Sequence, residues 1–168
     1  HCGSVLSVAF SPDGKYAISG SEDKTLKIWE VASGTEIHTL EEHSWVVSSV
    51  AFSPDGKYAI SGSWDKTIKI WDVSSSRAIH TLKGHSGSVL SVAFSPDGKY
   101  AISGSEDNTL KIWNLASGTE IRTLEGHGSS VISVVFSPDG KYAISGSWDK
   151  TIKTWDVSSG TEIRIFGG

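Results

Sequence analysis

A serine, a histidine and an aspartate recur together four times along this chain. In the first stretch they are Ser19, His1 and Asp23, and the same three residue types return every 42 residues. A serine nucleophile, a histidine base and an aspartate that orients the base form the catalytic constellation of many hydrolases. The chemistry to consider first is therefore nucleophilic catalysis, and it depends on whether the fold brings the three side chains together.

The spacing of these residues follows from an internal repeat. Four 42-residue blocks account for all 168 residues, and the run SPDGKYAISGS is identical in each of them. A fixed period of this length indicates a repeat architecture in which each unit buries its faces against its neighbours. We expect a single domain built from the blocks 1–42, 43–84, 85–126 and 127–168.

Composition and charge narrow the class of protein. The chain is 38% hydrophobic, which is enough to bury a sizeable core. Its net charge is −4 and its 15 Lys and Arg residues are scattered singly, so nucleic acid and anionic membranes are not expected as main partners. No apolar stretch approaches the roughly 20 residues that span a bilayer. We therefore expect a soluble protein. Because the single cysteine, Cys2, cannot form an internal disulfide, nothing indicates an oxidising compartment, and we expect the protein to be cytoplasmic.

Each block predicts four short β-strands. In the first block these strands are Val5 to Phe10, Tyr16 to Gly20, Thr25 to Trp29 and Thr35 to Leu40. Ser-Pro-Asp-Gly between the first two strands predicts a hairpin turn, because proline fixes its own φ and glycine accepts a positive one. The other connections are short enough for antiparallel neighbours. The sequence thus predicts an all-β chain of four-stranded antiparallel sheets.

Two residue pairs stand at fixed places in the blocks. Gly-His occurs at Gly84-His85 and Gly126-His127, and Trp-Asp occurs near the end of the third strand at Trp71-Asp72 and Trp155-Asp156. Together with the period, these pairs resemble the WD-repeat β-propeller family, in which each four-stranded sheet is one blade of a ring. Glu42 before His43, and the pairs Trp29-Glu30 and Trp113-Asn114, depart from the pattern but keep the tryptophan. The resemblance covers the whole chain.

The resemblance gives the recurring serine, histidine and aspartate a structural role. In the family they form a buried polar network with the third-strand tryptophan, and such a network ties loops to strands. An enzyme seldom needs four copies of one triad, and the chain lacks a glycine-flanked nucleophile elbow. We therefore expect a non-catalytic protein with these network residues: His1, Ser19, Asp23, Trp29, His43, Ser61, Asp65, Trp71, His85, Ser103, Asp107, Trp113, His127, Ser145, Asp149 and Trp155.

Metal and cofactor chemistry is not indicated by the sequence. No HxxxH, CxxC or carboxylate cluster offers a set of ligands, so we expect neither a metal nor a cofactor. His38 and His80 occupy equivalent positions on the fourth strand of their blocks and are expected to face solvent.

The blocks differ in a regular way at the residue before the aspartate of the network, which is Asp23 in the first block. In the family this position lies on the upper rim beside the central channel, where proteins or peptides bind. Exposed tryptophans there are rigid anchors of the kind that dominate interaction hot spots. Alternatively, these tryptophans only pack on neighbouring loops and blades. The predicted rim comprises the alternating Glu22, Trp64, Glu106 and Trp148, joined by Trp45 and Val46 from the loop that opens block two.

Four blades of this family make half a ring, since such blades suit rings of seven or eight. An open arc exposes two apolar faces, and the end blocks carry no polar capping residues. A homodimer would close an eight-bladed ring, with block four of one copy against block one of the other. A partner chain with the missing blades, or another copy number, are the alternatives. We call this contact between the two copies the predicted seam, and it comprises His1, Cys2, Val135, Thr154, Ile165, Phe166 and Gly168.

Two classes of function remain. The first is a non-catalytic protein-protein interaction scaffold that assembles into a closed propeller and binds a protein or peptide through its rim, with a preference for basic ligands. The second is a half-propeller fragment or an engineered repeat protein whose main property is self-assembly, with no ligand of its own. An enzyme is disfavoured, because no block holds a unique set of titratable residues.

Overall fold

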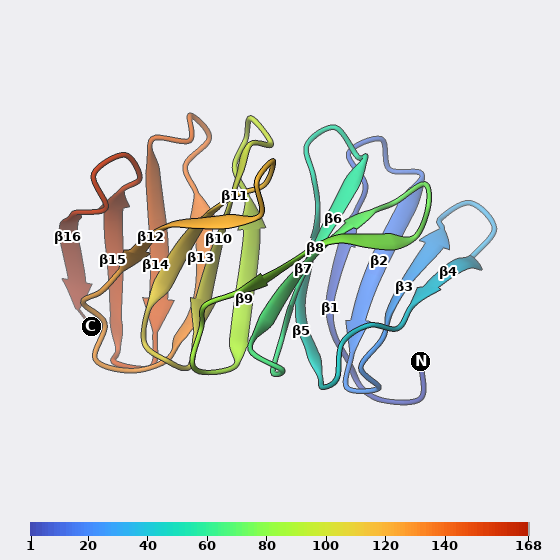
Figure 1. The fold of residues 1–168 in the computed structure, drawn as a ribbon, viewed down its shortest axis with the longest axis horizontal. Helices are drawn as coiled ribbons and strands as arrows, with labels where there is room; N and C mark the ends of the chain where they lie inside the picture. The colour runs from blue at the N-terminus through green and yellow to red at the C-terminus, as the bar shows by residue number, and fades with distance from the viewer. Residues whose placement is uncertain (168) are drawn as a thin grey trace.

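A computed structural model describes residues 1–167 and confirms an all-β chain. Each block folds into one antiparallel sheet whose strands follow chain order (Figure 1). Within these residues no helix is long and apolar enough to cross a membrane. The strands are β1 (Val5–Phe10), β2 (Tyr16–Ser21), β3 (Leu26–Glu30), β4 (Thr35–Leu40), β5 (Val47–Phe52), β6 (Tyr58–Ser63), β7 (Thr67–Asp72), β8 (Arg77–Lys83), β9 (Val89–Phe94), β10 (Tyr100–Ser105), β11 (Leu110–Asn114), β12 (Thr119–Leu124), β13 (Val131–Phe136), β14 (Tyr142–Ser147), β15 (Thr151–Asp156) and β16 (Glu162–Gly167).

The hairpin turn predicted from Ser-Pro-Asp-Gly is present in each sheet. Between β5 and β6, the amide of Gly56 donates to the carbonyl of Ser53 at 2.9 Å, and Gly56 has a φ of 71°. The Asp55 carboxylate accepts the hydroxyl of Ser53 at 2.6 Å and the amide of Lys57 at 3.1 Å. These local bonds replace the ladder bonds that the turn interrupts and fix the register of the first two strands.

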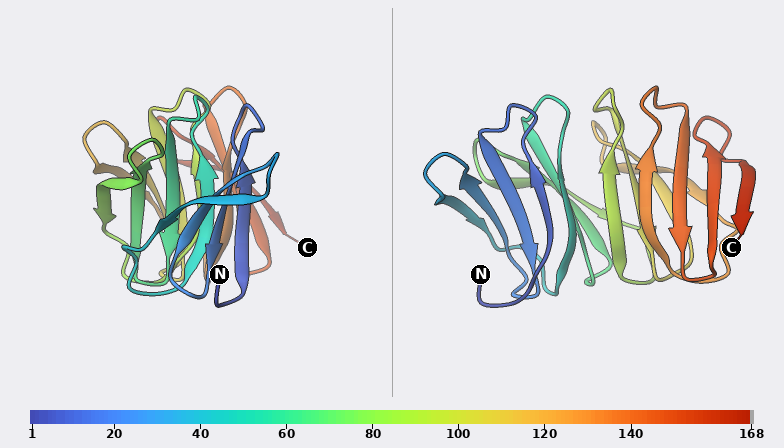
Figure 2. Two further views of the ribbon diagram at one scale, coloured as in Figure 1. Left: turned by 90° about the vertical axis from the view of Figure 1, so that its right-hand side faces the viewer. Right: turned by 180° about the vertical axis from the view of Figure 1, so that it is seen from behind.

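The four sheets stand side by side in a row, in chain order, and the views of Figure 2 show the same arrangement from the side and from behind. The first strands of the sheets lie next to one another, β1 beside β5, β5 beside β9 and β9 beside β13. The sheets formed by β1–β4 and β13–β16 lie at opposite ends of the row (Figure 1). We call each sheet a blade, and each contact between successive blades a seam.

The hydrophobic core lies in the seams, and every core cluster is shared by two blocks. In the first seam Ile18, Leu26, Ile28 and Leu40 of blade one pack on Val47, Val50, Phe52, Ala59 and Trp71 of blade two. The second and third seams repeat this cluster with the equivalent residues 42 and 84 positions further on. A single blade therefore has no core of its own and depends on a neighbour for its burial.

Residues that are buried in the inner blades are exposed at the equivalent positions of the two end blades. Val47 is fully buried, whereas its equivalent in blade one, Val5, is 49% exposed. Ile102 is fully buried, whereas its equivalent in blade four, Ile144, is 39% exposed. Each end of the chain thus presents one half of a seam.

We predict that Ile102→Ala lowers the free energy of unfolding by about 2–5 kcal/mol, because it leaves a cavity in the third seam. The matched control is Ile121→Ala, which truncates a residue of the same blade that is 46% exposed, and its cost should stay below about 1 kcal/mol. Urea unfolding of the two variants measures the difference. Equal costs would contradict a core that lies between the blades.

Candidate functional site

In every blade the structure joins a tryptophan, a serine, a histidine and an aspartate in one chain of hydrogen bonds. In blade three the Trp113 indole N–H donates to Ser103 Oγ at 2.9 Å, and Ser103 Oγ lies 2.7 Å from His85 Nε2. His85 Nδ1 lies 2.7 Å from Asp107 Oδ2. Blade one (His1, Ser19, Asp23, Trp29), blade two (His43, Ser61, Asp65, Trp71) and blade four (His127, Ser145, Asp149, Trp155) repeat the arrangement.

The aspartate of this network connects two loops. Asp107 stands in the turn between β10 and β11 and accepts the backbone amides of Thr109 and Ser86. Ser86 belongs to the loop that leads into β9, so a single carboxylate links the entry of the blade to its second turn. The polar network thereby ties loops to strands, as buried and satisfied networks do.

The serine, histidine and aspartate have the geometry of a catalytic triad, but the serine has no access to a substrate. Ser103 is fully buried, and its oxygen already accepts the indole N–H of Trp113. A nucleophile must reach the atom it attacks, with an open position beside it. The network therefore favours a structural role. In the described part of the chain no group of three or more His, Cys, Asp or Glu side chains is arranged to hold a metal ion.

The network aspartates are held in their ionised form. Burial by itself would raise the pKa of Asp107, but the hydrogen bonds from His85 and Thr109 outweigh it and hold this pKa well below its ordinary value. The same causes lower the pKa of Asp65 through His43 and Thr67. The pKa of Asp149 is also lowered, by hydrogen bonds that outweigh burial.

The predicted rim lies at the end of the blades that carries the second turn of each sheet. Trp64 and Trp148 stand in these turns and are 40% and 64% exposed, and Trp45 is 57% exposed. Trp64 donates its amide to the carbonyl of Val46 at 3.0 Å, so its turn lies against the loop that carries Trp45. Glu22 and Glu106 are exposed in the equivalent turns of the other two blades.

One predicted rim residue does not offer its side chain to a partner. Val46 is buried, with 7% of its surface exposed. Its carbonyl accepts the amide of Trp64, while its side chain turns into the protein. The adjacent Trp45, in the bend before β5, is exposed instead.

The structure separates the predicted seam residues into three groups. The open face of blade four is the face on which no further blade packs. It carries Val135, Thr154 and Phe166, since Phe166 pairs with the exposed Ile152, and Val135 and Thr154 are equivalent to Ala9 and Ile28 of the first seam. Ile165 pairs with the buried Lys153 and so lies on the other face of the sheet. His1 belongs to the polar network and Cys2 is exposed. Gly168 lies outside the described residues.

Sequence reasoning missed most of the two open faces. It considered the positions at which block four differs from the others, whereas the exposed apolar residues of the faces are mostly common to all blocks. The signal that could have found them was their place in the first or last block. The missed residues are Val5, Val8, Phe10, Ile144 and Ile152, with exposures from 39% to 71%.

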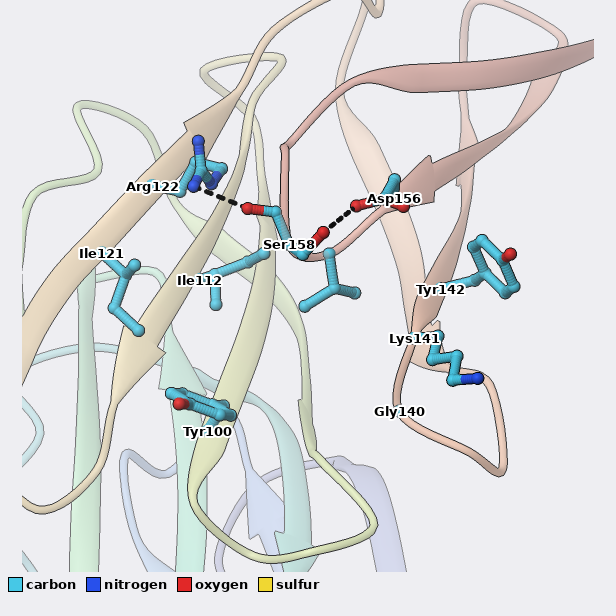
Figure 3. A pocket seen from close by; sticks show the side chains of 10 residues that line it. Tyr100, Ile112, Ile121, Arg122, Gly140, Lys141, Tyr142, Asp156 and Ser158 are labelled. Carbon is cyan, nitrogen blue, oxygen red and sulfur yellow. Dashed lines mark hydrogen bonds between the residues drawn. The ribbon is translucent and has the colours of Figure 1, made fainter.

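Three grooves run between the outer strands of successive blades, with volumes of about 440–490 Å³. His38 and His80, which were expected to face solvent, are only half-exposed and line two of them. These histidines lie on β4 and β8, and the loop after the third strand of the next blade lies beside each of them and covers it in part. In the third groove Arg122 takes the histidine's place beside Tyr100 and Ile121 (Figure 3).

The comparison with protein families agrees with this architecture. The family model described as "WD domain, G-beta repeat" matches residues 1–30, 34–72, 76–114 and 118–156. The chain belongs to the WD-repeat family. Each matched WD repeat after the first runs from the fourth strand of one blade to the third strand of the next, so it crosses a seam. WD-repeat domains generally serve as interaction scaffolds.

Curated relatives resemble single repeats of this WD-repeat chain. A 35-residue segment is 69% identical to the vegetative incompatibility protein HET-E-1 of Podospora anserina and covers 21% of the chain and 3% of that protein. A 45-residue segment is 47% identical to the WD repeat domain-containing protein 83 homolog of Dictyostelium discoideum and covers 27% and 14%. A 43-residue segment is 54% identical to the probable serine/threonine-protein kinase PkwA of Thermomonospora curvata and covers 25% and 6%. The matched segments thus span a small part of each relative.

We predict that Asp107→Asn lowers the free energy of unfolding at pH 7 by about 1–3 kcal/mol, because it weakens the bonds to His85 and Thr109. In the unsubstituted chain the lowered pKa of Asp107 contributes stability that is complete well above the ordinary value of 3.8 and is lost as the pH falls below it. The variant should therefore lose less stability than the parent chain between pH 6 and pH 3. Chemical unfolding at several pH values measures both slopes, and parallel slopes would contradict the assignment.

Proposed function

We propose that this chain is a protein-interaction scaffold that completes its propeller with a second copy of itself and binds a basic peptide or protein segment through its Trp/Glu rim. The observation that carries the proposal is that the two open ends present the two halves of a seam that the chain already forms three times. The family match supports the scaffold class.

The open face of blade one supplies the first half of this seam. In blades two, three and four the first strand packs its two valines and its phenylalanine against the preceding blade. In blade one the equivalent residues are Val5, Val8 and Phe10, which are 49%, 71% and 70% exposed. Apolar side chains arranged on one face in this way mark an interaction surface.

The open face of blade four supplies the second half. Ile144, Ile152 and Phe166 stand where blade one buries Ile18, Leu26 and Leu40 in the first seam, and all three are exposed. Thr154 is smaller than the isoleucine of the other blades, while Phe166 and Val135 are larger than the Leu and Ala they replace. These changes offset one another in volume, which seam packing tolerates best.

A hydrogen bond from a backbone amide to a serine hydroxyl oxygen extends the match. In each seam the serine in the middle of the first strand accepts the valine amide of the next blade, as Ser7 does from Val50 at 3.0 Å and Ser91 from Val134 at 3.2 Å. Ser133 is the equivalent serine of blade four. In a closed ring it would accept the amide of Val8 from the second copy. Two copies of four blades give eight, and a two-fold assembly forms two identical seams.

The rim supplies the ligand surface of this scaffold. Trp45, Trp64 and Trp148 are exposed, and tryptophan contributes large contact areas at low entropic cost. The turns between them carry Glu22 and Glu106, whose charge favours a basic ligand. In an eight-bladed ring the second turns would alternate between glutamate and tryptophan around the channel.

Self-assembly without a ligand is the second candidate, and the identity of the framework favours it. The turn and second strand are the same in all four blocks, and the complementary end faces require no further partner. The two candidates share the closed ring and differ only in the rim.

We predict that Gly146→Ala weakens the dimer. The equivalent Gly104 has room for no further carbon, because an added Cβ would lie 2.7 Å from Val131 of the next blade. At Gly146 an added Cβ meets nothing within 4 Å in the single chain, but in the ring it would meet Val5 of the second copy. Light scattering over a dilution series should show a mass near twice 17.9 kDa for the unsubstituted chain and an approximately tenfold or larger rise in the dissociation constant for the variant.

The control for this measurement is Gly104→Ala, which should lower the unfolding free energy of the chain itself, because its clash lies inside one copy. A monomeric parent chain, or a Gly146→Ala dimer as stable as the parent, would contradict the eight-bladed ring.

We predict that the double substitution Trp64→Ala and Trp148→Ala reduces peptide binding by about tenfold or more without unfolding the ring. The probe is an array of peptides that combine lysine or arginine with apolar residues, followed by fluorescence anisotropy of each peptide that binds. The matched control is Ile79→Ala with Ile121→Ala, which removes two exposed isoleucines far from the rim, on the outer strands of the blades. Unchanged affinity in the tryptophan variant would refute the rim assignment, and an array without any binder would favour self-assembly alone.

A further inference from the structure

The third seam contains a polar contact between blades that involves no residue of the polar networks. Arg122 on β12 of blade three donates from Nη1 to the carbonyl of Ser159 at 2.9 Å and from Nη2 to the carbonyl of Ser158 at 2.8 Å. Figure 3 shows its guanidinium beside the loop between β15 and β16 of blade four. A guanidinium that reaches two successive carbonyls holds this loop in one place, because its donors form a rigid fork.

The equivalent residue at the end of the chain is another arginine. The four positions read His38, His80, Arg122 and Arg164, so blade four repeats the arginine of blade three. Arg122 is half-buried in its groove, whereas Arg164 is exposed. Blade four thus presents to solvent a donor that blade three uses inside a seam.

The residues that surround Arg164 are equivalent to those that surround Arg122. Blade three contributes Tyr100, Ile112, Ile121 and Arg122 to the third groove. At the open end a shallower hollow of about 320 Å³ is lined by the equivalent residues Tyr142, Thr154, Ile163 and Arg164, together with Phe166. This hollow is one wall of a groove whose other wall is missing from the chain.

Blade one carries the missing wall. The loop between β3 and β4 is equivalent to the loop that Arg122 contacts, and Ala32 and Ser33 stand where Ser158 and Ser159 supply their carbonyls. Glu30 stands where Asp156 lines the third groove, so a carboxylate is kept close to the arginine position. The same loop is exposed in the single chain.

The residue that faces the arginine provides an independent match. Gly160 lies so close to Arg122 that an added Cβ would overlap its Cδ. The equivalent Gly34 has a φ of 70° and open space around it in the single chain. In the first seam, where the arginine is replaced by His38, the equivalent position holds Ser76 at a φ of 58°. Glycine thus faces the arginine in the third seam, and Gly118 likewise faces His80 in the second, where an added Cβ would lie 2.7 Å from the ring Nδ1. Serine faces a histidine in the first seam alone.

We infer that Arg164 is the specificity contact of the seam between two copies, and that its guanidinium donates to the carbonyls of Ala32 and Ser33 of the second copy. The inference rests on the proposed closure of the ring and assigns one residue to it. The contact selects a second copy over an unrelated apolar surface, because the guanidinium needs two carbonyls and a glycine at fixed positions. It also occurs twice in the ring, once at each seam.

The first experiment compares the dimer dissociation constant of the full chain with that of Arg164→Ala by light scattering and sedimentation over a dilution series. Each seam should weaken by about tenfold, so the dissociation constant should rise by about 100-fold, since both seams lose two charged hydrogen bonds. Arg122→Ala is the matched control. Because its contact lies within one chain, it should lower the unfolding midpoint and leave the dissociation constant unchanged.

The second experiment replaces the pair Gly34 and Arg164 with the serine and histidine pair of the first seam. Gly34→Ser should weaken the dimer, because the new Cβ would overlap Arg164. The double variant Gly34→Ser with Arg164→His should recover affinity relative to Gly34→Ser alone, because it recreates the pair that His38 and Ser76 form in the first seam. Circular dichroism and the unfolding midpoint verify that each variant is folded.

The outcomes separate the two proposals. If the parent chain dimerises and Arg164→Ala has the same dissociation constant, the arginine contact is overturned and the ring stays intact. Absence of recovery in the double variant, when Gly34→Ser alone weakens the dimer, also overturns the pairing of position 34 with position 164. A parent chain that is monomeric at every concentration overturns the ring and the contact together.

Discussion

The packing of one blade on the next is the interaction on which the rest of this structure depends. Every core cluster takes its residues from two successive blocks, and no blade buries its own apolar faces. Removal of this apolar surface from water is the main stabilising contribution available to a chain of short strands, since a single sheet of this size is marginal in water. The same packing explains why the end blades of a four-blade chain present apolar surface.

The buried tryptophan of each blade connects this packing to the polar network. Trp71 belongs to the apolar cluster of the first seam and also donates its indole N–H to Ser61. Through that serine it is linked to His43 and Asp65, and hence to the loops at the rim end of the blade. The side chains that resemble a catalytic triad therefore hold the rim loops in register with the core. A rim built on such a rigid base can present tryptophans at fixed positions, which binding surfaces require.

The nearly identical blocks differ at a few positions, and the proposed functions rest on these differences. The strand and turn framework repeats without change, whereas the rim alternates between glutamate and tryptophan, and the outer-strand position changes from histidine to arginine halfway along the chain. In the proposed scaffold, the first variation would change what the rim binds. The second changes how tightly the outer part of a seam is fixed. Repeat proteins can vary such positions independently, because each blade contacts only its neighbours.

The sequence by itself determined the strands and the hairpin turns, because alternation and Pro-Asp-Gly act over a few residues and recur in four copies. The members of the polar network followed from the resemblance to the WD-repeat family. It predicted the third strand as Thr25 to Trp29, one residue before the observed Leu26–Glu30. Only the tertiary structure decided which copies are buried. Ile102 and Ile144 have the same neighbours in sequence but opposite exposure, since a neighbouring blade covers one and not the other. It likewise decided that Val46 is buried and that His38 is half-exposed, because the burial of a side chain depends on what packs against it and not on its own sequence.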